Sequence, residues 1–282
     1  MENIGIHSIS NEPMNDILAL VTQYKELGLH TIIDYDKFNR YAVTYHSTAL
    51  EGATLTEEET AVLLDEGITP KGKPLEHSLM VKDHYDALLF VLHAAENRTP
   101  VTAGFIRQIS ARVMKTTGSI INTPLGTVDA SKGELRKSNV RAGRHYFITY
   151  DKVPDALALF VRQIAGDLQK AATPDKQLLL AFSAHFDLVS IHPFYDGNGR
   201  VSRLLMNYIQ ALFSLPLSIV FQDDKAAYIT ALNESGKAEN KQPFYDFMLQ
   251  EYTRFLTGEI QKYHSLQQTP PVKKGSSFGL FF

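Results

Sequence analysis

A chain of 282 residues, 44% of them hydrophobic, is long enough to bury one large core or two smaller ones. It contains no cysteine, which excludes disulfides, thiol chemistry and zinc sites with thiolate ligands. A formal net charge of −3 predicts no general attraction to nucleic acid or to anionic membranes. No apolar run reaches about 18 residues and no signal-peptide pattern opens the chain, so we expect a cytoplasmic protein.

The first part of the chain is expected to be helical. Apolar residues recur at helical spacing in four of its stretches, at residues 17–27, 32–51, 75–97 and 102–114. Between the second and the third, Thr56 and Glu59 form a capping-box pattern that predicts one more helix. We expect residues 1–98 to form an N-terminal helical region, followed by a domain over residues 99–257.

Residues 118–150 differ in character from the segments around them. They contain few helix formers, several glycines and alternating pieces, which predict a loop with a short β-hairpin, the one non-helical feature of the chain. The edge of a hairpin exposes unpaired N–H and C=O groups, so a segment of another protein could dock there as an added strand. The residues that would form this edge are Asn139, Val140, His145 and Tyr146. An ordinary surface hairpin is an equally good interpretation.

The rest of the chain is again predicted to be helical, over residues 153–170, 176–191, 198–213, 228–233 and 244–256. The fold class is therefore all-α, a mainly helical bundle with one short β-hairpin. We expect residues 258–282 to be a mobile tail, because the segment from Gln267 holds two prolines and a polar, lysine-containing piece. Its last five residues, FGLFF, would fold back on the body or touch a partner.

A glycine-rich turn, HPFYDGNGRVSR at residues 192–203, joins the helices expected at 176–191 and 198–213. Gly197 and Gly199 flank Asn198 where the chain turns, and a glycine lets the backbone come close to a ligand. Free N–H groups at the start of a helix, together with the helix dipole, favour an anion. The turn is therefore predicted to hold phosphate.

Charged residues in the same turn extend this prediction. Arg200 and Arg203 are three residues apart on the second helix, so both can lean over the same phosphates. A base, His192, and a carboxylate that could bind metal, Asp196, lie beside them in the sequence. The spacing alone predicts an anion site with a base next to it.

The same twelve residues resemble the signature of the Fic family, H-x-F-x-[D/E]-G-N-G-R-x-x-R, at every fixed position. The resemblance implies the Fic (Fido) fold and nucleotidyl transfer, usually of AMP from ATP to a hydroxyl of another protein. It also implies that the hairpin region is the flap over the active site. Relatives that phosphorylate carry Lys at the position of Gly199, and a phosphocholine-transferring relative carries Ala at that of Gly197, so AMP transfer is favoured.

Transfer of AMP assigns a role to each residue of the turn. The attacking hydroxyl must lose a proton, and His192, with an ordinary pKa near 6.5, can accept it at neutral pH. Mg²⁺ usually binds one carboxylate together with substrate phosphates, and Asp196 would supply it. The remaining residues would hold the phosphates of ATP: Gly197, Asn198, Gly199, Arg200 and Arg203.

Within the Fic family, the pattern S/T-x-x-x-E-G/N marks an inhibitory helix whose Glu occupies the active site. Ser47 and Glu51, followed by Gly52, fit this pattern at the end of the helix expected at about 32–51. The pattern recurs at Ser235 and Glu239. We prefer Glu51 because an unbroken helix precedes it.

The main hypothesis is thus a protein adenylyltransferase that its own Glu51 inhibits. Two alternatives stay open: a hydrolase that removes AMP from a target at the same site, and a catalytically idle module that senses nucleotide. The target protein is not identified by the sequence, and self-modification and a homodimer are both compatible with it. No nucleic-acid or membrane partner is expected.

Overall fold

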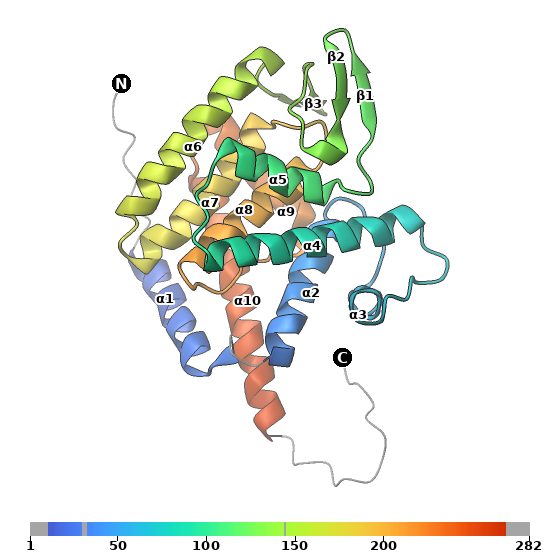
Figure 1. The fold of residues 1–282 in the computed structure, drawn as a ribbon. Helices are drawn as coiled ribbons and strands as arrows, with labels where there is room; N and C mark the ends of the chain where they lie inside the picture. Colours follow the sequence, from blue (N-terminus) through green and yellow to red (C-terminus); the bar gives the residue numbers. More distant parts are fainter. Residues whose placement is uncertain (1–10, 30–32, 144, 269–282) are drawn as a thin grey trace.

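The structure, a computed structural model, describes residues 11–29, 33–143 and 145–268. This part of the chain forms ten α-helices and two small β-hairpins (Figure 1), in agreement with the predicted fold class. The N-terminal helices are α1 (Asn11–Glu26), α2 (Ile33–Ala49), α3 (Glu57–Glu66), α4 (Leu75–Glu96) and α5 (Ala103–Val113). After the hairpins come α6 (Val153–Lys170), α7 (Pro174–Ile191), α8 (Asn198–Leu212), α9 (Lys225–Ala238) and α10 (Gln242–Gln268).

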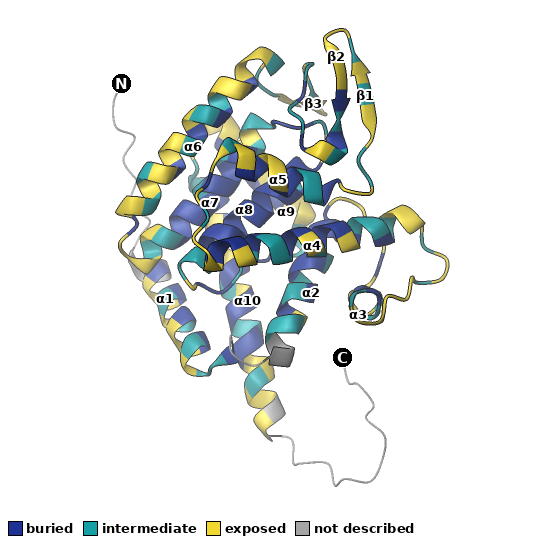
Figure 2. Ribbon diagram, in the orientation of Figure 1, coloured by how far each residue is buried: buried dark blue, intermediate teal, exposed yellow. Residues whose placement is uncertain are grey.

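Helix α8 lies at the centre of the fold. Helices α2, α4, α5 and α7 pack against it, and twelve of its fifteen residues are buried. Figure 2 shows this helix in dark blue near the centre of the view, whereas α6 at the upper left is partly yellow and teal. Two of its buried residues are arginines, and a buried charge is costly unless partners surround it. The start of α8 is therefore where the structure must supply acceptors.

The N-terminal helices share their core with the rest of the chain. One cluster of buried apolar side chains includes Leu88 from α4, Phe105 from α5 and Leu205 from α8, on both sides of the boundary expected at residue 98.

The predicted capping box is present at the start of α3. Thr56 Oγ1 accepts from the Glu59 N–H at 3.1 Å, and the Glu59 carboxylate accepts from the Thr56 N–H at 2.9 Å.

The region 118–150 contains two hairpins where one was predicted. Strand β1 (Ile120–Thr123) pairs with β2 (Gly126–Asp129), and β3 (Arg141–Ala142) pairs with β4 (His145–Tyr146), both antiparallel. The reason is that two glycines at positive φ, Gly126 (101°) and Gly143 (58°), each allow a tight turn.

The C-terminal helices are longer than predicted. Helix α10 continues to Gln268 and keeps Ile260 buried against the core, so the prediction of a mobile tail from residue 258 is wrong for residues 258–268. Helices α1 and α9 pack against α10, which explains why the helix extends. Residues 269–282, with the two prolines and the apolar end, lie outside the described residues. None of the described helices is both long and apolar enough to cross a bilayer.

Candidate active site

The turn between α7 and α8 begins with a helix end at His192. The backbone of His192 is left-handed (φ 53°, ψ 59°), and its N–H still donates to the Leu188 carbonyl at 3.1 Å. Few residues other than glycine adopt this conformation, and histidine is among those that do. Pro193 follows and cannot continue the helix. Phe194 is 3% exposed and belongs to the hydrophobic core, so it anchors the turn to the body of the protein.

The side chain of Asn198 is bound within the turn. Its Oδ1 accepts from the Phe194 N–H at 3.0 Å, and its Nδ2 donates to the Phe194 carbonyl at 2.9 Å. The amide is 3% exposed, and both of its ends are used inside the turn. The amide of Asn198 therefore braces the turn, and the second N–H of its Nδ2 is the side-chain donor that is left for a phosphate.

The imidazole of His192 is held in the form that can accept a proton. Its Nδ1 lies 3.3 Å from the Val189 carbonyl, and because a carbonyl only accepts, Nδ1 carries the hydrogen and Nε2 the lone pair. Burial lowers the pKa of His192 to about 4, although the hydrogen bond to Val189 acts in the opposite direction. At neutral pH the ring is therefore uncharged, as a general base must be.

Asp196 and Arg200 form the outer side of the site. The Asp196 side chain is 67% exposed; its Oδ1 accepts from the Gly197 N–H at 2.6 Å, and its Oδ2 lies 3.7 Å from Arg200 Nη2. The Arg200 side chain is 2% exposed, and its Nη1 lies 3.5 Å from the Val113 carbonyl. Its buried Nε has no hydrogen-bond partner among the described residues. Arg200 thus has donor capacity left for an anion.

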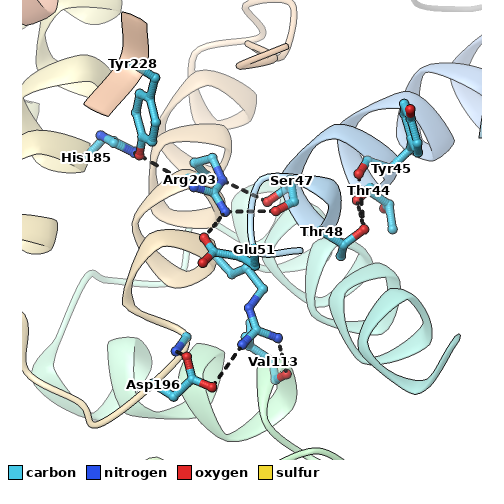
Figure 3. Close-up of polar contacts among 12 residues, drawn as sticks. Thr44, Tyr45, Ser47, Thr48, Glu51, Val113, His185, Asp196, Arg203 and Tyr228 are labelled. Carbon is cyan, nitrogen blue, oxygen red and sulfur yellow. Dashed lines mark hydrogen bonds and ion pairs between the residues drawn. The ribbon is translucent and has the colours of Figure 1, made fainter. Parts of the chain in front are cut away.

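Arg203 is bound to the end of α2, as Figure 3 shows. Its Nε donates to Ser47 Oγ at 2.9 Å, and its Nη2 donates to the Ser47 carbonyl at 2.9 Å and to Glu51 Oε1 at 2.6 Å. On its other side, Nη1 lies 3.5 Å from the Tyr228 hydroxyl, which contacts His185 Nε2 at 3.0 Å. The structure therefore brings together Ser47, Glu51 and Arg203, which the sequence separates by about 150 residues.

Glu51 lies just beyond the helix that was expected to carry it. Helix α2 ends at Ala49, and Glu51 and Gly52 form the turn that follows, with Gly52 at φ 102°. Burial opposes ionisation of Glu51, but the neighbouring Arg203 and Arg200 guanidiniums hold the pKa of its carboxyl below the usual value. Glu51 is therefore charged at neutral pH.

The Glu51 carboxylate rests against the first turn of α8, at the absent side chain of Gly199. A Cβ on Gly199 would lie 2.5 Å from Glu51 Oε1 and 3.0 Å from Arg203 Nη1. A glycine is thus required at this position for the carboxylate to fit. The carboxylate of Glu51 thus lies beside the first turn of α8, next to the helix start that was predicted to hold phosphate.

The second copy of the inhibitory pattern lies at the end of α9 and serves the local turn. Glu239 is the left-handed residue that ends the helix, and Ser235 Oγ accepts from the Phe244 N–H at 3.0 Å. Neither contact involves an arginine of the turn between α7 and α8. The preference for Glu51 over Glu239 is therefore supported by the contacts.

The predicted flap residues, Asn139, Val140, His145 and Tyr146, lie in or next to the second hairpin, β3 and β4. Tyr146 is 70% exposed, and His145 packs edge-to-face on Phe147. Asn139 and Val140 precede β3 and make bonds within the flap: Asn139 Oδ1 accepts from the Tyr150 N–H at 3.0 Å, and the Val140 carbonyl accepts from the Phe147 N–H at 3.4 Å. Hydrogen bonds between its own residues therefore hold the flap together.

Three residues that contact the turn were not singled out from the sequence. Phe147 stacks on His192, Arg136 donates to the His192 carbonyl, and the Tyr195 hydroxyl contacts the Lys137 N–H and Ser138 Oγ. Arg136 and Phe147 lie in the region with least periodicity, where the sequence gives no sign of which side chains are buried. Tyr195 occupies a variable position of the Fic signature.

Comparison with known proteins agrees with this geometry. Residues 100–210 match the model of the Fic/DOC family. The protein adenylyltransferase fic-1 of Caenorhabditis briggsae is 26% identical over 234 residues, which are 81% of this chain and 42% of that protein. The protein adenylyltransferase Fic of Drosophila melanogaster is 29% identical over 209 residues, 72% of this chain and 39% of that protein. The chain thus spans about two fifths of the length of these curated relatives.

A solved structure shows the same fold. It is a Fic-domain-containing signaling protein from Bacteroides thetaiotaomicron, with a TM-score of 0.76, 24% identity, and coverage of 88% of this chain and 98% of that one. The turn with all fixed residues of the signature, the matched domain and the shared fold agree. The chain therefore carries a Fic domain at residues 100–210 and shares its fold with a Fic-domain protein.

Proposed function

We propose that this chain is a protein adenylyltransferase that transfers AMP from ATP to a hydroxyl of a target protein. The observation that carries the proposal is the neutral imidazole of His192, with Nε2 as its free acceptor, next to an anion-binding helix start that holds two arginines. The relatives named protein adenylyltransferase support the same reaction.

The reaction that fits this site is a displacement at the α-phosphorus of ATP. The target hydroxyl oxygen forms the new bond to phosphorus while the bond to the pyrophosphate oxygen breaks, and the hydroxyl proton moves to His192 Nε2. The N–H groups at the start of α8, with Arg200 and Arg203, would hold the phosphates and balance their charge. Pyrophosphate leaves, and the target carries AMP.

Mg²⁺ would enter this site with ATP. Among the residues that the structure describes, no three His, Asp or Glu side chains are grouped around a place for an ion. In nucleotide sites, however, Mg²⁺ usually binds one or two carboxylates and takes its other ligands from phosphates and water. Asp196, whose side chain is 67% exposed next to Arg200, fits that role. The ion would neutralise charge on the phosphates.

Replacing Asp196 tests its role. In a Glu51→Gly background, Asp196→Ala should abolish most transfer, and raising Mg²⁺ modestly should not restore it, because no other carboxylate of the turn can replace it. Asp196→Asn separates charge from bracing, since an amide oxygen can still accept from the Gly197 N–H. Asp155→Ala, at an exposed position of α6, is the control. Full activity of Asp196→Asn at modest Mg²⁺ would restrict Asp196 to a structural role.

We also propose that Glu51 inhibits the enzyme in the conformation in which it binds Arg203. Its carboxylate lies against Gly199 at the start of α8 and binds the Arg203 guanidinium, which the β- and γ-phosphates of ATP would need. A triphosphate could not then settle with its α-phosphorus facing His192. The alternative of AMP removal uses the same pocket, with Glu51 positioning a water molecule.

Ser47→Ala should release part of this inhibition. The substitution removes the acceptor of Arg203 Nε but leaves the bonds to the Ser47 carbonyl and to Glu51. A hydrogen bond to a charged group contributes about 1.5–3 kcal/mol, so we expect an increase in auto-modification of about tenfold. The control is Thr48→Ala, because Thr48 Oγ1 bonds only within α2. Equal labelling of Ser47→Ala and wild type would show that the serine hydroxyl does not hold the closed state.

One experiment tests the proposed function directly. A lysate is treated with the Glu51→Gly variant and with ATP labelled at the α- or the γ-phosphate. Protein label from α-labelled ATP only is the expected result, and mass spectrometry then identifies the target and shows whether the chain modifies itself. Label from γ-labelled ATP would indicate a kinase. No label in either case would favour the idle module, and loss of AMP from modified protein would favour the hydrolase.

A further inference from the structure

The face of the His192 ring is covered by one side chain of the flap. The rings of Phe147 and His192 have centroids 3.7 Å apart and an interplanar angle of 17°, which is a stacked arrangement. Phe147 also contacts His145 edge-to-face, with centroids 4.8 Å apart and an angle of 77°. The imidazole is thus held at its edge by the Val189 carbonyl and on its face by Phe147.

Arg136 fixes the flap to the backbone of the same histidine. Its side chain is 2% exposed, and its Nε donates to the His192 carbonyl at 2.8 Å. Its Nη1 donates to the Ser138 carbonyl at 3.0 Å and its Nη2 to the Ile148 carbonyl. The guanidinium therefore joins the catalytic turn to both ends of the flap, and Ile148 is the residue next to Phe147.

Backbone contacts strengthen this connection. The Arg136 N–H donates to the Pro193 carbonyl at 3.0 Å, and the Tyr195 hydroxyl accepts from the Lys137 N–H at 3.2 Å. The left-handed backbone of His192 is a strained conformation that persists only where its surroundings hold it. Arg136, bound to the carbonyl of that residue, is one of the groups that does so.

From these contacts we propose that Phe147 and Arg136 are positioning residues for the base: Phe147 sets the plane of the His192 ring, and Arg136 holds the flap and the His192 backbone in one unit. The inference rests on the proposed function. It goes further because it makes the flap part of the apparatus that orients the base, in addition to any part in docking the target. A target segment that displaces the flap would move the ring as well.

The test is made in the Glu51→Gly background with Phe147→Leu, Phe147→Tyr and Arg136→Lys. Leucine keeps the site apolar but removes the planar face, tyrosine keeps the face, and a single ammonium cannot span three carbonyls. We expect Phe147→Leu and Arg136→Lys to lower kcat for auto-modification by about tenfold or more, because a small misplacement of a base is costly. The KM for ATP should stay within about twofold in both variants. Phe147→Tyr should recover most of the rate.

A second readout follows the ring of His192 itself. Its titration is recorded by NMR from the carbon-bound ring proton, without nucleotide. In the parent, burial lowers the pKa of His192 to about 4, and Phe147→Leu should raise it toward its ordinary value of about 6.5 by admitting water to one face. The charged or titratable groups that act on the ring, Arg136, His145 and (in the wild type) Glu51, are unchanged by that substitution. The acid limb of the rate profile should move to higher pH with it.

Phe38→Leu, at a half-exposed phenylalanine of α2, is the control for the loss of an aromatic ring. An unchanged His192 titration together with a kcat within about twofold of the parent in Phe147→Leu would overturn the proposal. If Arg136→Lys does not fold, the Phe147 variants decide the outcome. If the parent transfers no AMP, the proposed function fails, and the NMR titration still shows whether Phe147 holds the ring.

Discussion

Glu51→Gly should raise auto-modification with labelled ATP by at least about a hundredfold over the wild type. The side chain removed is the carboxylate that lies 2.6 Å from Arg203 Nη2 and fills the space above Gly199. Without it, Arg203 keeps only its bonds to Ser47 and Tyr228, and the helix start is open to a phosphate. To move a site from mostly closed to mostly open requires about 5 kcal/mol, and the loss of a charged partner from a guanidinium that is 4% exposed is of that order.

The phosphates of ATP are the natural replacement for this carboxylate. A buried arginine that loses its partner has an uncompensated charge, which costs about 3–5 kcal/mol. The variant should therefore bind the triphosphate in the position where its phosphates pair with the Arg203 guanidinium. The measurement is incorporation of label from α-labelled ATP, with wild type and variant side by side. Glu239→Gly is the matched control, because it removes the Glu of the second pattern. Equal labelling of wild type and Glu51→Gly would exclude Glu51 as the inhibitor.

The position of the turn between α7 and α8 could be predicted from the sequence because its pattern is local. The spacing of His192, Asp196 and the two arginines is set by one helix end and the next helix start, and short-range patterns describe such ends reliably. The contact between Glu51 and Arg203 spans more than 150 residues, and only a family resemblance suggested it. No propensity of either segment indicates that the end of α2 should lie over the start of α8.

Other features depended on tertiary contacts that no local pattern contains. Asn198 was predicted to hold phosphate, and no local pattern indicated that its amide also pairs with the backbone of Phe194. Arg136 was not singled out from the sequence; it is buried, and the carbonyls of His192, Ser138 and Ile148 accept from its guanidinium. The end of α10 was placed too early because its packing against α1 is not visible in sequence.

His192→Ala, in the Glu51→Gly background, should reduce AMP transfer by about 10²–10⁴-fold and leave ATP affinity nearly unchanged. The imidazole is the group whose free Nε2 can take the proton of the attacking hydroxyl, since Nδ1 is engaged with the Val189 carbonyl. Asp196 is a poor substitute because it faces Arg200, and arginines cannot act as bases at neutral pH. ATP binding should persist because the groups expected to hold the phosphates are the helix start, Arg200 and Arg203, which the substitution does not touch.

Two measurements separate these effects: calorimetric titration with ATP gives the affinity, and the initial rate of labelling gives the transfer. His93→Ala is the matched control, because that histidine lies on the exposed side of α4 with 77% of its side chain accessible. A single alanine at position 192 also removes the partner of Phe147, so His192→Gln is added to keep a polar side chain there without a general base. If both substitutions at 192 lowered the transfer rate less than about tenfold while ATP still bound, the proton would have to leave through another group, and His192 would be misassigned as the base.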